Sequence, residues 1–341
     1  MNLRFQPYTL ELKHAFGLAA STRTTTPAML VEVEVDGVIG YGEAAMPPYL
    51  GESQATAAVF LERARDFLAG CADPFQLEEI IPAIDALALG NPAAKAAVDI
   101  ALHDWIGKRL GAAWHRLWGL DPAKAPVTSF TIGIDTAEMV RKKTLEASIY
   151  KILKVKLGRD AESDRMMITT IREVTDQPIT IDANQGWKNR DDACRMIEWC
   201  AARQVLLIEQ PMPKAQVDDT AWLRARSPLP LIADESVQRL ADIKQAHGVF
   251  DGVNIKLMKC TGLREAHRMI LLARALDLKV MLGCMTETSC AISAAAQLSP
   301  LVDWADLDGA VLVKNDCFEG ALIVEGRLTL PAWPGIGVRK R

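Results

Sequence analysis

The alternation of hydrophobic and polar positions divides the chain into two unequal regions. Near the N-terminus, the segment AMLVEVEVDG (28–37) alternates apolar and charged residues, and its Val-Asp-Gly turn leads into VIGYGEA. This pattern predicts a β-hairpin. An Ala-rich amphipathic stretch follows between Asn91 and Gly111, whose ends are typical helix start and stop residues. The first third of the chain is therefore predicted to be α+β.

From about residue 126, short β-branched apolar runs alternate with amphipathic segments such as TAEMVRKKTLEA and TGLREAHRMILLARAL. The runs recur roughly every 25 residues, the length that a strand, a helix and two loops require. Eight runs at this spacing predict parallel βαβ units and favour a barrel. A doubly wound open sheet is the alternative, but the sequence lacks the glycine-rich turn that normally follows its first strand.

Polar residues lie at the C-terminal ends of these runs, and side-chain alternation places them on one face. In KILKVKLG, Lys154 and Lys156 alternate with apolar residues that would pack under the helices, so both lysines should face the barrel interior. Active sites of β/α barrels lie at this end of the strands. A single such residue is usually a loop residue or a helix cap. The same parity nevertheless turns a whole set inward: Thr131, Asp182, Glu209, Asp234, Lys256, Asp306 and Asp308.

Three of these residues, Asp182, Glu209 and Asp234, come from consecutive predicted strands. Clustered buried carboxylates repel one another unless a cation neutralises them. Oxygen ligands alone suit a hard ion, so the pattern predicts Mg²⁺ before Zn²⁺. Salt bridges to Lys154 and its neighbours are the alternative explanation.

Lys156 and Lys256 belong to the second and sixth predicted strands, on opposite walls of a barrel. Burial and a nearby cation lower the pKa of a lysine, which can then act as a base near neutral pH. Two lysines on opposite faces of one carbon could remove a proton and return another. The carbanion would need its charge on a carboxylate, as an enediolate stabilised by Mg²⁺. A Schiff-base lysine is the competing chemistry, but it does not need three carboxylates.

These residues resemble the enolase superfamily, and within it the muconate-lactonising subgroup. The resemblance covers nearly the whole chain. It rests on five motifs in order, at Lys154-Val155-Lys156, Asp182-Ala183-Asn184, Glu209-Gln210-Pro211, Asp234-Glu235-Ser236 and Asn254-Ile255-Lys256. It implies a modified (β/α)₇β barrel over residues 121–319, with an α+β capping domain over residues 1–120 completed by 320–341. It also implies that Lys156 and Lys256 are the acid/base pair, assisted by Lys154, and that the three carboxylates hold Mg²⁺.

Further motifs resemble dipeptide epimerases. Asp306-Leu307-Asp308 is similar to a signature that binds the ammonium group of a dipeptide, and Arg23 matches an arginine that binds the glutamate side chain in L-Ala-D/L-Glu epimerases. Thr131 and Cys284 are expected to contact the substrate. The resemblance implies epimerisation at the C-terminal residue of cell-wall dipeptides. A cycloisomerase, an o-succinylbenzoate synthase, an N-acylamino-acid racemase and a non-catalytic binding protein are the alternatives.

Composition indicates which binding partners and which cellular location to expect. The 341 residues carry a net charge of −4, and no basic segment is dense enough to predict nucleic-acid binding. The N-terminus does not resemble a signal peptide, and the sequence has no apolar run of about 18 residues, so no membrane partner is expected. Seven scattered cysteines indicate reduced thiols and a cytoplasmic location. Homo-oligomers are common among similar proteins, so one is expected here.

Overall fold

The computed structural model describes residues 1–17 and 22–341. Its centre is a sheet of eight parallel strands, hydrogen-bonded in sequence order. A bridge between Thr128 and Ala305 connects the two ends of this sheet, so the barrel is nearly closed. All eight strands predicted from the sequence are present: β4 (Ser129–Ile132), β5 (Ile152–Lys156), β6 (Ile179–Asp182), β7 (Val205–Glu209), β8 (Leu231–Ala233), β9 (Gly252–Lys256), β10 (Lys279–Gly283) and β11 (Trp304–Asp306).

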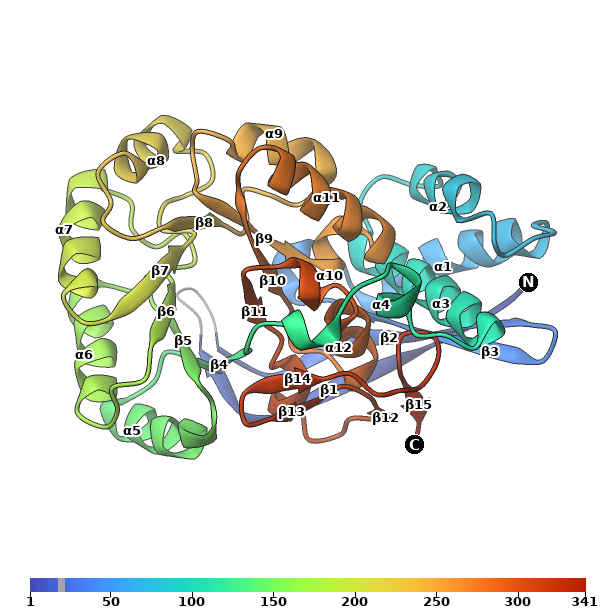
Figure 1. The fold of residues 1–341 in the computed structure, drawn as a ribbon, viewed down its shortest axis with the longest axis horizontal. Helices are drawn as coiled ribbons and strands as arrows, with labels where there is room; N and C mark the ends of the chain where they lie inside the picture. Colours follow the sequence, from blue (N-terminus) through green and yellow to red (C-terminus); the bar gives the residue numbers. More distant parts are fainter. Residues whose placement is uncertain (18–21) are drawn as a thin grey trace.

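Helices connect these strands and surround the barrel (Figure 1). They pack on the outward-facing strand residues, of which Leu153, Val155 and Ile181 are fully buried. Inside the barrel, Leu207, Ile232 and Met281 form a separate small cluster below the polar ends of the strands. The connecting helices are α5 (Ala137–Glu146), α6 (Ala161–Arg172), α7 (Arg190–Ala201), α8 (Val217–Arg224), α9 (Ile243–Ala246), α10 (Leu257–Cys260), α11 (Leu263–Ala275) and α12 (Ser289–Ala296).

The N-terminal region forms an antiparallel sheet of three strands, β1 (Asn2–Gly17), β2 (Thr22–Val35) and β3 (Val38–Ala45). The predicted hairpin is β2–β3, with the turn at Asp36-Gly37 in the left-handed backbone region that such turns favour. Helices α1 (Gln54–Ala69) and α3 (Pro92–Leu110) pack against the sheet, and α2 (Leu77–Ala86) and α4 (Trp114–Leu117) contact α3. Helix α3 starts after Asn91 and ends at Gly111, as the sequence predicted.

The chain returns to this sheet at its C-terminal end. The last short strand, β15 (Arg339–Lys340), pairs with β12 (Phe318–Glu319). Lys340 Nζ donates to Glu32 on β2 at 2.7 Å, and Ile336 N donates to Asp104 on α3 at 3.0 Å. In the sequence between β12 and β15, β13 (Leu322–Val324) and β14 (Arg327–Thr329) form a hairpin, and Arg327 pairs with Val127, just before β4. The two ends of the chain thus lie on the same side of the barrel (Figure 1).

Short one-turn 3₁₀ segments complete the element set: η1 (Pro48–Leu50), η2 (Pro122–Lys124), η3 (Ala147–Ile149), η4 (Leu240–Asp242), η5 (Ser299–Leu301) and η6 (Gly309–Leu312). Two of them matter for the cavity described below. Segment η1 carries Tyr49 from the N-terminal region to the open end of the barrel, and η6 follows Asp308. No helix in the described part of the chain has both the length and the apolar character needed to cross a membrane.

Candidate active site

The polar residues at the C-terminal ends of β5, β6 and β7 lie at the same level of the barrel because these strands pair in register. Lys156 pairs with Asp182, and Asp182 pairs with Glu209. Close backbone approach fixes this alignment beyond the strands. Gly158 has φ +95°, and a Cβ there would lie 2.0 Å from the carbonyl oxygen of Ala183, so a residue with a side chain would push β5 and β6 apart.

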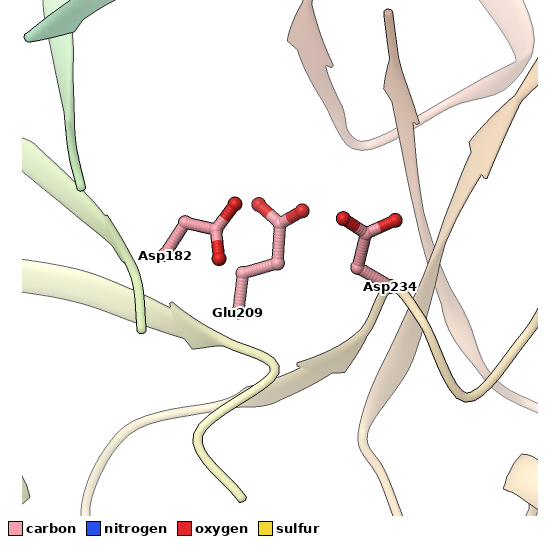
Figure 2. A group of neighbouring side chains, drawn as sticks. All are labelled: Asp182, Glu209 and Asp234. Atoms are coloured by element: carbon pink, nitrogen blue, oxygen red, sulfur yellow. The ribbon is translucent and has the colours of Figure 1, made fainter. Parts of the chain in front are cut away.

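Asp182, Glu209 and Asp234 form an acidic triad that is almost completely buried. Each offers one oxygen, and these three atoms lie within 4.8 Å of one another. The carboxyl groups point to a common space above the ends of β6, β7 and β8 (Figure 2). Burial, and then the charge of Asp182, raises the pKa of Glu209 to about 7. Such crowding of buried carboxylates is what a divalent cation relieves.

The hydrogen-bond partners of the two Glu209 oxygens support a cation site at the triad. Asn254 Nδ2 donates to Glu209 Oε1 at 2.7 Å and so fixes the carboxylate orientation. Room for the Asn254 side chain exists because position 283 is glycine, where a Cβ would lie 2.5 Å from Asn254 Oδ1. Glu209 Oε2 is buried and lies 2.6 Å from Lys154 Nζ, yet no described residue gives it a hydrogen bond of good geometry. An all-oxygen site with an incompletely bonded carboxylate fits a hard cation such as Mg²⁺.

The two lysines predicted to exchange protons reach the cavity from opposite walls. Lys156 Nζ lies 2.5 Å from Asp182 Oδ2, and Lys256 Nζ lies 2.7 Å from Asp234 Oδ2. At Lys256, a partner carboxylate acts against the lowering of the pKa that the sequence predicts from burial and a nearby cation. Burial lowers its pKa, but the adjacent Asp234 outweighs burial and raises the pKa well above the ordinary value.

Lys154 lies behind the cavity. Its amine is 2.7 Å from Asp306 Oδ2, 2.6 Å from Glu209 Oε2 and 3.5 Å from Asp182 Oδ2, and only 1% of the residue is exposed. Burial opposes its charge, but the three carboxylates outweigh burial and raise the pKa of Lys154 well above its ordinary value. Lys154 therefore neutralises charge between the triad and Asp306.

The two aspartates of the Asp306-Leu307-Asp308 motif have different partners. Asp306 accepts from Ser129 Oγ at 2.7 Å in addition to its contact with Lys154. Asp308 accepts from the backbone N–H of Thr131 at 2.6 Å. Burial, and then the charge of Asp306, raises the pKa of Asp308 to about 7. A bound cationic group would relieve this repulsion as well.

A cavity of about 220 Å³ opens above these groups. Its wall includes eight of the eleven residues predicted from the sequence. Lys154, Asp182 and Glu209 lie beneath the wall. The eight are Arg23, Thr131, Lys156, Asp234, Lys256, Cys284, Asp306 and Asp308. Burial, and then the charge of Glu287, raises the pKa of the Cys284 thiol well above its ordinary value, so Cys284 is a neutral wall residue.

Residues from the N-terminal region close the outer side of the cavity. Arg23 donates from Nη2 to Thr286 Oγ1 at 3.3 Å and lies 5.4 Å from the centre of the Phe16 ring. Thr286 is in turn 2.6 Å from the hydroxyl of Thr26. Arg23 Nε is buried and has no hydrogen-bond partner among the residues described. A buried guanidinium with an unused N–H is suited to an anionic ligand.

Sequence reasoning missed several cavity residues. Tyr49 has a half-exposed ring, but its hydroxyl points inward and lies 2.6 Å from Met285 Sδ. Thr286 and Glu235 also line the cavity. Glu235 directly follows Asp234 in the motif that suggested a metal ligand, so its position carried a signal. Tyr49 lies in PPYLGES (47–53), a segment that resembles a capping loop, but the resemblance did not assign this residue a role. Thr286 lies in a loop, where strand parity does not apply.

A barrel with a separate capping region and this set of strand-end residues defines a class of proteins, and comparison with known families agrees. Residues 5–119 match the model described as "Mandelate racemase / muconate lactonizing enzyme, N-terminal domain", and residues 135–340 match "Enolase C-terminal domain-like". The chain belongs to the enolase superfamily. The predicted barrel fold and the predicted family are therefore confirmed.

Individual relatives refine this result. The chain is 58% identical to the L-Ala-D/L-Glu epimerase of Bacteroides thetaiotaomicron, over 100% of this chain and 88% of the relative. A dipeptide epimerase from Enterococcus faecalis V583, crystallised with Mg and L-Leu-L-Tyr, superposes with a TM-score of 0.93 at 30% identity, covering 99% of this chain and 98% of the other. An N-succinyl Arg/Lys racemase from Bacillus cereus superposes with a TM-score of 0.91 at 27% identity, covering 99% and 95%.

Proposed function

We propose that the protein is a Mg²⁺-dependent dipeptide epimerase that interconverts L-Ala-L-Glu and L-Ala-D-Glu by inverting the α-carbon of the C-terminal residue. The observation that carries the proposal is the placement of two buried lysines, Lys156 and Lys256, on opposite walls of one cavity beside an acidic triad. The relative at 58% identity, which is named L-Ala-D/L-Glu epimerase, supports the choice of substrate.

The roles of the chain's own groups follow from this arrangement. One lysine, as a neutral amine, takes the α-proton, and the other, as an ammonium, delivers a proton to the opposite face of the same carbon. Mg²⁺ held by Asp182, Glu209 and Asp234 would stabilise the negative charge that develops on the substrate carboxylate. The charge of Lys154 favours the ionised form of Asp182, Glu209 and Asp306. Lys256 must leave Asp234 before it can act as a base.

Substrate recognition uses the remaining wall. We assign the dipeptide ammonium to Asp306 and Asp308, since two adjacent buried carboxylates favour a cation. Arg23, whose Nε–H has no partner among the described residues, binds the glutamate side-chain carboxylate. Thr131 and Cys284 contact the body of the substrate. The alternative reactions, among them racemisation of an N-succinyl amino acid, use substrates without a free α-ammonium group, so the two aspartates distinguish them.

The test follows the α-proton by NMR in D₂O. Wild-type protein with Mg²⁺ should incorporate deuterium into L-Ala-L-Glu and form the epimer, and chelation of Mg²⁺ should stop both. Asp306→Asn combined with Asp308→Asn should reduce kcat/KM for the dipeptide by about 100-fold or more, because each lost charge-assisted contact is worth about 1.5–3 kcal/mol. Deuterium exchange at the α-carbon of N-succinyl amino acids, without exchange in dipeptides, would contradict the proposal and favour the racemase reaction.

The setting of this activity is also part of the proposal. All seven cysteines are free. This supports work in the cytoplasm, where thiols stay reduced. We propose that the enzyme processes peptides from cell-wall turnover, acts as a homo-oligomer, and divides into a capping domain (1–120 with 320–341) and a catalytic barrel (121–319).

A further inference from the structure

Lys259 is a buried lysine that the proposed chemistry does not use. It lies on α10, the single helical turn that follows β9, three residues after Lys256. Only 3% of the residue is exposed, and it is not part of the cavity wall. An ammonium group removed from water in this way needs acceptors for its three N–H bonds.

Four oxygens surround the Lys259 amine. Its Nζ lies 2.6 Å from Asp234 O, 2.5 Å from Asp234 Oδ1, 3.0 Å from Val237 O and 3.1 Å from Asn254 O. Three of these acceptors are backbone carbonyls, in the segment after β8 and in β9. Lys259 therefore ties the loop that carries Asp234 to the neighbouring strand.

The two lysines of this segment divide the Asp234 carboxylate between them. Lys256 contacts Oδ2 from the cavity side, and Lys259 contacts Oδ1 from the buried side. The backbone N–H of Asp234 is held as well, by Gln210 Oε1 at 2.9 Å. Because the two lysines contact different oxygens, a rotation of Lys256 toward a substrate would free Oδ2 and leave the contact with Lys259 in place.

We propose that Lys259 is a positioning residue that holds Asp234 in the orientation needed to bind the metal ion. The inference rests on the proposed function, because that function assigns Mg²⁺ to the triad. A ligand fixed in advance binds its ion without first giving up conformational freedom, and loss of a group that orients a ligand typically weakens metal affinity by about 10- to 100-fold.

A purely structural lysine would behave differently, and the chain contains one for comparison. Lys95 on α3 is 5% exposed. Its amine lies 2.9 Å from Asp85 O, 2.8 Å from Asp85 Oδ1 and 2.7 Å from Ala88 O. Lys95 thus has the same kind of environment, one carboxylate and backbone carbonyls, but it lies in the N-terminal region outside the site.

The experiment compares Lys259→Met with Lys95→Met. Both variants should unfold at a lower temperature than the wild type without Mg²⁺, because each loses a buried set of charge-assisted hydrogen bonds. Calorimetric titration of the folded proteins with Mg²⁺ alone should show about 10- to 100-fold weaker binding only for Lys259→Met. The Mg²⁺ concentration for half-maximal activity should rise in parallel, and saturating Mg²⁺ should restore most of kcat.

Equal Mg²⁺ affinity in wild type and Lys259→Met would overturn the inference and leave the proposed function intact. Absence of Mg²⁺ binding by the wild type would instead overturn the proposed function. If Lys259→Met does not fold, Lys259→Arg replaces it. A planar guanidinium cannot converge on four acceptors as an ammonium does. We therefore expect weaker Mg²⁺ binding there too, and unchanged affinity would again overturn the inference.

Discussion

The barrel side and the outer side of the cavity are built in different ways. On the barrel side, Lys154, Lys156 and Lys256 each lie within 2.5–2.7 Å of a buried carboxylate oxygen. On the outer side, the described residues give Arg23 one side-chain hydrogen bond, of 3.3 Å, and no partner for its Nε–H. The lysines of the barrel side thus already have carboxylate partners, whereas the outer side leaves a cationic group for an anionic ligand to bind.

This difference separates chemistry from substrate choice. Groups that move a proton need fixed geometry and partners that tune their charge. Groups that select among substrate side chains need only bind one substrate more strongly than another. Changes on the barrel side should therefore affect every substrate, and changes on the outer side should affect glutamate-containing dipeptides most.

Removal of either cavity lysine should have the largest effect. Lys156→Ala or Lys256→Ala should lower epimerisation by about 10⁴-fold, the upper range for loss of a positioned acid or base. The remaining lysine faces one side of the α-carbon only. Deuterium exchange by NMR should therefore show one variant losing exchange from L-Ala-L-Glu and the other from L-Ala-D-Glu.

A control for these variants is Lys142→Ala, which removes an exposed lysine on α5. Its exchange rate should equal that of the wild type. Should both cavity variants lose exchange from the same epimer and keep it from the other, the two lysines would not act on opposite faces.

Arg23→Ala should have an intermediate effect that depends on the substrate. Loss of a charge-assisted contact to the glutamate carboxylate should reduce kcat/KM for L-Ala-L-Glu by about 10- to 100-fold. L-Ala-L-Leu lacks that carboxylate, so its kcat/KM should stay the same or rise. Parallel steady-state measurements on the two dipeptides test this, and an equal loss on both would place Arg23 with the catalytic groups.

Sequence patterns predicted the barrel side well for a physical reason. Alternation along a strand assigns a face to each residue, so the inward orientation of Lys154, Lys156 and Asp182 follows from the sequence alone. All eight strands, the β2–β3 hairpin and the bounds of α3 followed from equally local rules.

The outer side was less predictable because no local rule positions it. Tyr49 reaches the cavity from a 3₁₀ segment far from the barrel in sequence, and Thr286 lies in the loop between β10 and α12. The inward position of Lys259 was not predicted because this residue lies in a single helical turn after β9, where strand parity no longer applies. The raised pKa of Lys256 was also missed, since it depends on the 2.7 Å approach of Asp234 and not on burial alone.

The smallest predicted effect is on the pH dependence of stability. It concerns Glu43, which links the N-terminal sheet on the outer side of the cavity to the barrel side. Glu43 lies on β3, and its carboxylate accepts from Thr288 N at 2.9 Å and from Ala291 N at 3.3 Å, at the start of α12. Thr288 follows the cavity loop that contains Thr286. Burial raises the pKa of Glu43 from 4.5 to about 7, because it outweighs the hydrogen bonds to Thr288 and Ala291, and Asp316 adds repulsion.

Since the folded-state pKa is the higher one, the folded protein keeps a proton between about pH 4.5 and about pH 7 that the unfolded chain releases. Glu43 should therefore make the protein less stable as the pH rises through this window, by at most about 3 kcal/mol, with no further change above about pH 7. Glu287, which faces Glu43 and whose pKa burial raises to about 8, adds a slope of the same sign that extends to higher pH. Urea unfolding across the window should give a shallower pH dependence for Glu43→Gln than for the wild type, with Glu34→Gln on the same sheet as a surface control. If the slopes of wild type and Glu43→Gln coincide, the carboxylate at this junction does not exchange its proton on folding, and the contact between the two sides of the cavity is independent of pH.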